Sequence, residues 1–421
     1  MSCHIFHKCN FWSSHWPLLG ILVLTVITFW PTFSNGFQME WDDQWQVLNS
    51  YTSGGLSLAE LRISFTRGIS GQYDPLNQLM YSLLWRIDGY NSMIFHAACL
   101  FLHLTNVYCI FALVRTIVED CTSLKSDRIQ WIVVVTTIFF AIHPLQVESV
   151  AWISASKIVM STLFYLLAGM SLIHFIKEGG FVRYTLVFVF MLFSYFSKET
   201  AVTFPLWATL LCLWYGLSPH ENRFWRILIP IYLAALLLGC HAIFVVTSYH
   251  RYLGEGTFIW WQRIVYCFYS IVTYLFKWLF PLNLSWMYRY PTPLGESLPS
   301  WLLSYPLLFS ILIYALWERI RHPYISSALM FSLIHLLFVL HLIVLPREAV
   351  VADRYMYLPL VGLNFIFAYV LTSPLILRSY RKGVFSAVLL LVVVSSCLAY
   401  SRTKDWVDSS TLKKEKVIDN K

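Results

Sequence analysis

Charged residues are scarce in this sequence, since they make up only 12% of its 421 residues, whereas soluble globular proteins contain about 25%. Hydrophobic residues make up 58%. A soluble chain of this length could not hide so much apolar surface in one core, because the remainder would face water. The shortage of charge therefore argues against an ordinary soluble domain and favours a protein that lies in a lipid bilayer.

Cysteine pairs and the common catalytic signatures are also missing. None of the nine cysteines stands in a CxxC arrangement, and most lie inside apolar runs, so neither a disulfide framework nor a metal site is indicated. There is no glycine-rich phosphate loop, zinc signature or Ser/His/Asp nucleophile motif. The net charge of +8 comes from short loops without a basic face, so nucleic acid is not an expected partner.

Long apolar runs dominate what is present. The first, 17–34, is predicted to be a retained signal anchor, and a mixed polar segment, 35–91, follows it. Further runs lie at 93–118, 129–145, 157–177, 182–197, 200–216, 225–248, 261–280, 301–318, 325–345, 356–377 and 383–400. We therefore predict one all-α integral membrane domain over 1–400, with 35–91 as its first outer loop and 401–421 as a short polar tail.

The charges of the loops indicate how many runs cross the membrane. Basic loops lie at 223–226, 318–322 and 378–382, and the positive-inside rule assigns such loops to the cytoplasm. With an inside N-terminus, this requires that 249–300 lie wholly outside. The run 261–280, which is rich in Tyr, Phe and Trp, is then re-entrant or interfacial. We predict about eleven transmembrane helices and an outside C-terminus.

With this topology, the unusual polar residues gather at the outer face. Asp42 and Asp43 open the first outer loop, and further polar residues lie at the ends of later spans: His143, Glu148, Lys157, Lys198, Glu199, Arg289, Asp353, Arg354 and Tyr355. Ionisable residues at such depth are costly and suggest a functional site. A carboxylate there can accept a proton from an attacking hydroxyl, while Lys and Arg hold a departing phosphate. This arrangement is expected for sugar transfer from a phospholipid carrier.

Each of these motifs also has a simpler structural interpretation. Asp42 and Asp43 could cap a short helix, since Asp is common at helix N-termini. The pair at 198–199 suits a helix boundary, and the pair at 353–354 suits a local ion pair. Histidines inside apolar runs are expected to be hydrogen-bonded core residues: His96, His103 and His335.

Six blocks of the sequence resemble, in order, the motifs of one membrane family. The most extensive is HPLQVESVAWIS at 143–154, followed by Lys157. The other five lie at 41–43, 91–103, 197–205, 281–285 and 351–359. Together they resemble the protein O-mannosyltransferase-like glycosyltransferases, which include the transmembrane, tetratricopeptide-bearing cadherin mannosyltransferases and bacterial relatives.

The resemblance implies a GT-C-like multi-span helical bundle with the activity of an inverting glycosyltransferase. The donor would be a sugar, mannose or another hexose, on a polyprenyl-phosphate carrier. The acceptor would be a hydroxyl of a protein, such as Ser or Thr, or of a glycan, at the outer or lumenal face. In this class the first outer loop carries the acidic base, so Asp43 is favoured for this role and Asp42 is the alternative.

The resemblance also implies roles for the other polar residues. Lys157, Lys198 and Arg354 are expected to bind the donor phosphate. Neither a metal nor another cofactor is implied, because cationic side chains can neutralise the leaving group. The remaining residues are expected to position the substrates: His143, Glu148, Glu199, Asp353, Tyr355 and Arg289.

Two residues depart from the family pattern, and they leave the sugar and the acceptor open. Ser156 and Asp74 stand where relatives usually carry Arg. The sequence shows no tetratricopeptide repeats, which favours a bacterial inner membrane over an endoplasmic reticulum membrane.

Two alternative functions remain. One is a lipid-linked sugar flippase or transporter, a class that often shows inverted repeats, which we do not find here. The other is a polysaccharide polymerase or ligase that uses a pyrophosphate-linked donor.

Overall fold

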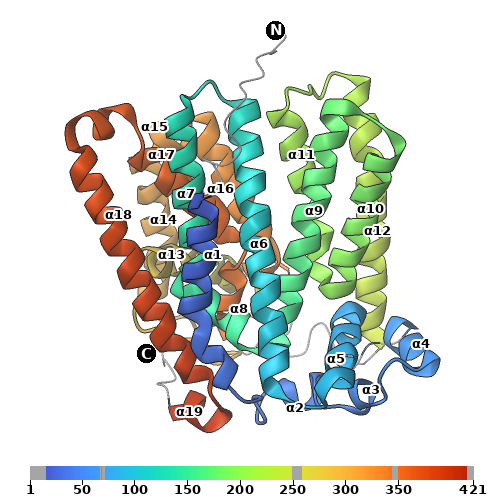
Figure 1. The fold of residues 1–421 in the computed structure, drawn as a ribbon. Coiled ribbons are helices and arrows are strands. Elements are labelled where there is room, and N and C mark those ends of the chain that lie inside the picture. Colours follow the sequence, from blue (N-terminus) through green and yellow to red (C-terminus); the bar gives the residue numbers. More distant parts are fainter. Residues whose placement is uncertain (1–15, 67, 69–71, 249–257, 344–348, 415–421) are drawn as a thin grey trace.

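A computed structural model describes residues 16–66, 68, 72–248, 258–343 and 349–414. Figure 1 shows a bundle of long helices that run roughly side by side, with several short helices gathered at one end. The eleven predicted spans each contain an apolar helix: α1 (Trp16–Phe29), α6 (Ser92–Cys121), α7 (Ser126–Ile142), α9 (Ser156–Glu178), α10 (Phe181–Ser197), α11 (Phe204–Trp214), α12 (Asn222–Ser248), α14 (Ser304–Ala315), α16 (Pro323–Leu336), α17 (Pro359–Leu371) and α18 (Pro374–Thr403).

Further helices, most of them short, and two strands connect the bundle helices. They are η2 (Trp30–Ser34), α2 (Asp43–Gln46), α3 (Ser50–Ser53), α4 (Leu58–Thr66), α5 (Pro75–Asp88), η3 (Pro144–Gln146), α8 (Val147–Ala151), η4 (Ile153–Ala155), η5 (Glu199–Thr203), α13 (Trp260–Leu279), β1 (Tyr288–Arg289), η6 (Ser300–Leu303), α15 (Trp317–Ile320), η7 (Leu337–Val339), β2 (Ala349–Val351), η8 (Asp353–Met356), η9 (Lys404–Trp406) and α19 (Ser409–Lys414). The strands β1 and β2 pair antiparallel, with Tyr288 opposite Val351.

The length of the helices confirms the all-α membrane class. Among the described residues, five helices are long and apolar enough to cross a membrane, and α7 with its bent continuation through α8 makes a sixth candidate. Five shorter apolar helices have 10–17 residues each, whereas a helix that spans the bilayer usually needs about 20. The count of eleven spans therefore stays a prediction.

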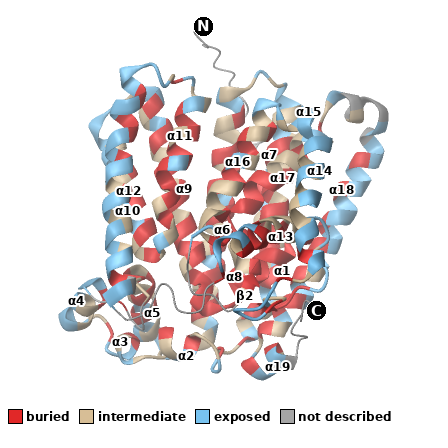
Figure 2. Ribbon diagram, turned by 180° about the vertical axis from the view of Figure 1, so that it is seen from behind, coloured by how far each residue is buried: buried red, intermediate tan, exposed pale blue. Residues whose placement is uncertain are grey.

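The exposed side chains of the peripheral helices also suit a bilayer. Figure 2 shows buried residues concentrated in the central helices, including α9 and α16, and exposed residues along α12 and α18 at the edges. Leu237 of α12 is 71% exposed and Leu390 of α18 is 63% exposed. Such apolar surface is unfavourable in water, and lipid tails accommodate it.

The run 261–280 differs from the other apolar runs, as the sequence predicts. It forms one 20-residue helix, α13, which is not among the span candidates found in the described residues. One face buries tyrosines such as Tyr266 and Tyr274, while Trp260 and Phe276 are exposed on the outside. This two-faced helix is consistent with an interfacial or re-entrant segment, and its depth in the membrane stays a prediction.

The predicted basic loops lie together at one end of the bundle. The connection before α12, the helix α15 and the start of α18 lie at the end opposite to α2–α5 (Figure 1). Helix α1 runs toward the end at which α19 lies. The grouping of the basic segments at the other end agrees with the positive-inside rule, and the membrane topology stays a prediction.

Two glycines let the central helices approach closely. A Cβ atom at Gly169 of α9 would lie 2.0 Å from the ring of Trp207 in α11, and one at Gly362 of α17 would lie 2.3 Å from the carbonyl oxygen of Ala328 in α16. Small residues at helix interfaces are the usual way to bring helices together in membranes.

Candidate active site

The sequence-favoured carboxylate, Asp43, lies fully buried at the start of α2. Its Oδ1 accepts hydrogen bonds from the backbone N–H of Ser154, at 2.9 Å, and from the Ser154 hydroxyl. Its Oδ2 accepts one from the backbone N–H of Gln38, at 2.9 Å. Burial is the largest influence and raises the pKa of Asp43 to about 6, although these three donors oppose the rise. Oδ1 thus ties the first outer loop to η4, while Oδ2 closes a hydrogen bond within the loop itself.

The neighbouring carboxylate, Asp42, has a different environment. It occupies the N-cap position of α2, yet its side chain makes no capping hydrogen bond there. Asp42 is only partly buried, and its charge acts on both Lys157 and Arg354. The structure therefore distinguishes two carboxylates that sequence reasoning could not separate.

Lys157 is held at the start of α9 by side-chain amides. Its Nζ donates to Oε1 of Gln46, at 3.2 Å, and to Oε1 of Gln72. Gln46 in turn donates to Asp74 Oδ2 at 2.5 Å. Burial is the largest influence on Asp74 and raises the pKa of this carboxyl, while the charge of Lys157 opposes the rise. Asp74, which departs from the family pattern, thus belongs to the network that surrounds Lys157.

Arg354 is anchored by the predicted positioning residue Glu148. Its Nη1 lies 2.5 Å from Glu148 Oε1, and its backbone N–H donates to Glu148 Oε2 at 2.8 Å. The guanidinium carbon also lies 5.3 Å from the ring centre of Trp152 and 4.9 Å from that of Tyr355, within range of cation–π attraction. Arg354 therefore pairs with Glu148 of α8, which is far away in sequence, and not with its neighbour Asp353.

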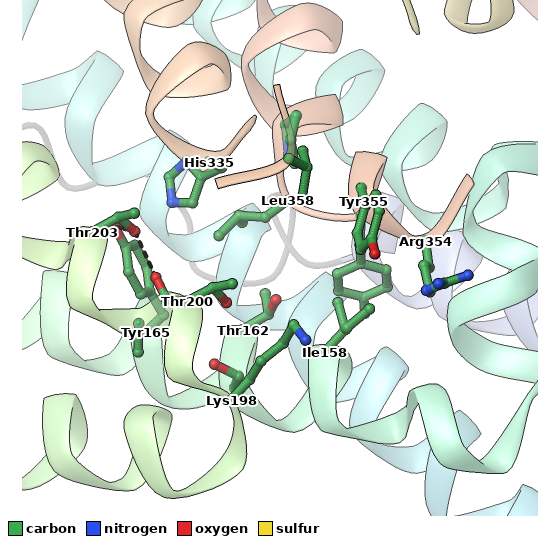
Figure 3. A pocket seen from close by; sticks show the side chains of 15 residues that line it. Ile158, Thr162, Tyr165, Lys198, Thr200, Thr203, His335, Arg354, Tyr355 and Leu358 are labelled. Carbon is green, nitrogen blue, oxygen red and sulfur yellow. Dashed lines mark hydrogen bonds between the residues drawn. The ribbon is translucent and has the colours of Figure 1, made fainter. Parts of the chain in front are cut away.

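A cavity that is open to solvent lies between α9, η5, the end of α16 and the start of α17. Lys198 and Arg354 bring two cations to this cavity, while Ile158, Val339 and several hydroxyl side chains line much of the rest. In Figure 3, Arg354 and Tyr355 lie at one side of the cavity, and His335 lies at the other.

His335 is a cavity residue that sequence reasoning assigned to core packing. Its Nδ1 lies 2.7 Å from the carbonyl oxygen of Phe331, so Nδ1 must carry a proton and donate it. In the neutral ring, Nε2 is then a hydrogen-bond acceptor, and this buried atom has no partner among the described residues. The ring packs edge-on against Tyr165, with ring centres 4.9 Å apart. The apolar sequence around His335 did not indicate that this residue lines a cavity.

Three predicted positioning residues lie away from the cavity. His143 is engaged with backbone, since Nδ1 accepts from Leu145 N–H at 3.2 Å and Nε2 lies 3.1 Å from the carbonyl oxygen of Trp278. Arg289 is exposed on β1. The Asp353 side chain accepts a hydrogen bond from the Tyr288 hydroxyl at 2.8 Å and does not line the cavity. Their proposed contacts with substrate stay predictions.

The boundary interpretation of 198–199 is confirmed, while the roles of both residues in substrate binding stay predictions. Helix α10 ends at Ser197, and η5 begins at Glu199. Lys198 lines the cavity and lies 3.7 Å from the Glu199 carboxylate, which is half exposed. His103, by contrast, is a hydrogen-bonded core residue as predicted, with Nδ1 2.7 Å from the Tyr357 hydroxyl oxygen. Among the described residues, no cluster of His, Cys, Asp and Glu could hold a metal ion.

The fold and this site define an all-α membrane protein with a cavity that Lys198 and Arg354 line, and with an acidic residue, Asp42, whose charge acts on Arg354. Over 161 residues the chain is 31% identical to human protein O-mannosyl-transferase TMTC1, and this alignment covers 36% of this chain and 17% of that protein. Over 203 residues it is 27% identical to Tmtc1 of Drosophila melanogaster, also named a protein O-mannosyl-transferase, with 46% and 22% covered. The alignments thus span about a fifth of each relative. No family model and no solved structure matches.

Proposed function

We propose that this protein is a membrane glycosyltransferase that moves a sugar, mannose or another hexose, from a polyprenyl-phosphate carrier to a hydroxyl acceptor. The observation that carries the proposal is the cavity with Lys198 and Arg354, together with the partly accessible carboxylate of Asp42, whose charge acts on Arg354. The names of the two relatives support Ser or Thr of a protein as the acceptor. The expected topology puts the reaction at the periplasmic or lumenal face.

In this proposal Asp42 is the general base, rather than Asp43. Asp42 is partly accessible and lies within the electrostatic influence of Lys157 and Arg354. It would take the proton of the acceptor hydroxyl while the hydroxyl oxygen bonds to the anomeric carbon. Asp43 would act as a positioning residue, because its Oδ1 holds the loop against Ser154 and its Oδ2 accepts a hydrogen bond from Gln38 of the same loop.

The leaving group and the sugar occupy different parts of the proposed site. As the bond between the anomeric carbon and the phosphate oxygen breaks, the carrier phosphate leaves with the bonding electrons. Lys198 and Arg354 would stabilise its charge, with Lys157 close by. At the other side of the cavity, Nε2 of His335 would accept a hydrogen bond from a ligand hydroxyl, which would satisfy this buried atom.

Purified protein in proteoliposomes, supplied with a panel of polyprenyl-phosphate sugars and a Ser/Thr acceptor peptide, tests this function. We expect Asp42→Asn to lower kcat by about 10²- to 10⁴-fold, the usual contribution of a general base, with a nearly unchanged donor KM. Glu40→Gln is the matched control, because Glu40 is an exposed carboxylate of the same loop.

Three outcomes would contradict the proposal. Undiminished transfer by both Asp42→Asn and Asp43→Asn would remove the carboxylate mechanism. Translocation of the sugar lipid without any acceptor would favour the flippase. Consumption of pyrophosphate-linked donors alone would favour the polymerase or ligase.

A further inference from the structure

The end of the chain packs against the loop that carries the acidic motif. Residues 402–409, here termed the strap, lie beside the first outer loop at one end of the bundle (Figure 1). The backbone N–H of Gly36 donates to the carbonyl oxygen of Val407 at 2.8 Å. The side chain of Gln38 donates to the carbonyl oxygen of Trp406 at 2.7 Å. A segment that the sequence describes as part of a polar tail is therefore joined to the first outer loop.

Gln38 connects the strap directly to the buried carboxylate. Its backbone N–H donates to Asp43, while its side-chain Oε1 accepts from the hydroxyl of Ser409 at 3.3 Å. The Ser409 hydroxyl also accepts from the backbone N–H of Glu40 at 3.1 Å. The position of the strap thus influences where the chain at 38–43 lies, and with it Asp42.

The other side of the strap holds the segment that carries Arg354. Arg402 Nη2 lies 3.2 Å from Asp353 Oδ2, and Arg402 Nη1 donates to the carbonyl oxygen of Leu284 at 2.9 Å. Both charged side chains are nearly inaccessible, at 7% and 1% exposure. A buried ion pair of this kind is held tightly, because separating its partners leaves an uncompensated charge.

An aromatic stack completes the link. Trp406 of the strap is fully buried and stacks on Trp152, with ring centres 5.9 Å apart and ring planes 24° apart. The guanidinium of Arg354 lies over the same Trp152 ring. Trp41, which immediately precedes Asp42, also contacts Trp152, with ring centres 6.1 Å apart.

We propose that the strap is a positioning element that sets the distance between the base at Asp42 and the phosphate-binding Arg354. This inference rests on the proposed function. In an in-line displacement the base and the leaving group must lie on opposite sides of the anomeric carbon, and a misplacement of about 1 Å can cost about 10²-fold in rate. Gln38, Arg402 and Trp406 are then positioning residues that touch neither substrate.

Substitutions in the strap and at its contact with the loop test the inference. We expect Gln38→Ala and Trp406→Ala to lower kcat by about tenfold or more, with donor KM changed less than about twofold. Trp406→Phe keeps an aromatic ring against Trp152 and is expected to restore most of kcat. Lys413→Ala is the control, because its ion pair with Glu40 is exposed and lies beyond the strap.

A second measurement does not depend on activity. Amide hydrogen exchange in Trp406→Ala should become faster in both loops, at 36–48 and at 349–356, and should stay unchanged in both loops in Lys413→Ala. Wild-type kcat in Gln38→Ala and Trp406→Ala, or faster exchange in only one loop, would overturn the proposal. If the wild-type protein transfers no sugar, the proposed function fails, while the exchange experiment still shows whether the strap joins the two loops.

Discussion

At the scale of single residues, the two adjacent aspartates show how environment separates identical side chains. Asp43 points into the protein and receives three hydrogen bonds, whereas Asp42 stays partly accessible near two cations. Burial penalises the charged form of a carboxyl, and donors favour it. This difference supports our proposal that Asp42, rather than Asp43, accepts the proton from the substrate.

The raised pKa of Asp43 predicts a pH-dependent stability. Its folded-state pKa is about 6, against 3.8 for the ordinary group, and about 1.36 kcal/mol corresponds to each unit. Protonation stabilises the folded state, so the contribution of Asp43 is fully present below about pH 4 and is lost as the pH rises through about 6. The loss amounts to about 3 kcal/mol.

This effect is measurable as a difference between wild type and Asp43→Asn, whose side chain does not titrate. Denaturant unfolding in detergent between pH 4 and pH 8 should show wild type losing stability relative to the variant as the pH rises. The comparison isolates Asp43 from Asp353, whose pKa burial also raises. Parallel curves for the two proteins would contradict the prediction.

The two cations of the cavity should differ in what they contribute to stability. Arg354 pairs with a carboxylate that is 1% exposed, while Lys198 lies 3.7 Å from one that is 56% exposed. Breaking a buried pair costs about 3–5 kcal/mol, and an exposed pair is worth about 1 kcal/mol or less. Arg354→Met should therefore lower the free energy of unfolding several times more than Lys198→Met.

Kinetic measurements on the same two variants separate the effect on stability from the effect on donor binding. Both should raise the donor KM, because each loses a cation from the proposed phosphate site. Equal destabilisation of the two variants would contradict the structural difference, and an unchanged donor KM in both would contradict the phosphate site.

At the scale of elements, the cavity depends on how closely helices approach. Helices α9 and α11 meet at Gly169 against Trp207, and helices α16 and α17 meet at Gly362. Gly169 lies one turn after Tyr165 and Gly362 one turn after Pro359, and both Tyr165 and Pro359 line the cavity. A larger side chain at either glycine would push apart the two helices that meet there.

Alanine substitutions at glycines give a matched test of this packing. Gly169→Ala should destabilise the protein by about 1–3 kcal/mol, since overpacking forces neighbouring groups to move. Gly239→Ala is the control, because a Cβ atom there meets nothing within 4 Å, and alanine in a helix is favoured over glycine by about 0.5–1 kcal/mol. Thermal unfolding in detergent checks both, and similar effects for the two variants would disprove the packing argument.

At the scale of the whole molecule, the bundle has two chemically different ends. Helices α2–α5 and α19 lie at the end with the acidic motif, while α15 and the other basic segments lie at the opposite end (Figure 1). The positive-inside rule assigns the basic end to the cytoplasm. The proposed lumenal reaction depends on this orientation.

Labelling with a charged, membrane-impermeant thiol reagent tests the orientation. Leu58→Cys, at a position 86% exposed in α4, should react in intact cells or spheroplasts. Arg321→Cys, at an exposed position after α15, should react only after the membrane is opened. The unmodified protein controls for its native cysteines, and reaction of both positions from the same side would refute the predicted topology.

Much of the architecture follows from the sequence alone. Each predicted span contains an observed helix, because long apolar runs can satisfy their backbone in lipid only as helices. The bounds are less accurate, since the run 325–345 outlasts α16, which ends at Leu336, and the run 383–400 begins inside α18, which starts at Pro374. The different character of 261–280 was also visible, since its aromatic residues and Lys277 set it apart. The acidic motif at Asp42 and Asp43 and the cations Lys198 and Arg354 were identified from their residue types and expected locations.

Only the tertiary structure decided which of these groups share a site and which hold the fold together. Burial and hydrogen-bond partners separate Asp42 from Asp43, bring His335 to the cavity and place the strap against the first outer loop. These are contacts between residues far apart along the chain, so no local pattern encodes them. The sequence by itself determined the bilayer and the helices, because both follow from local hydropathy.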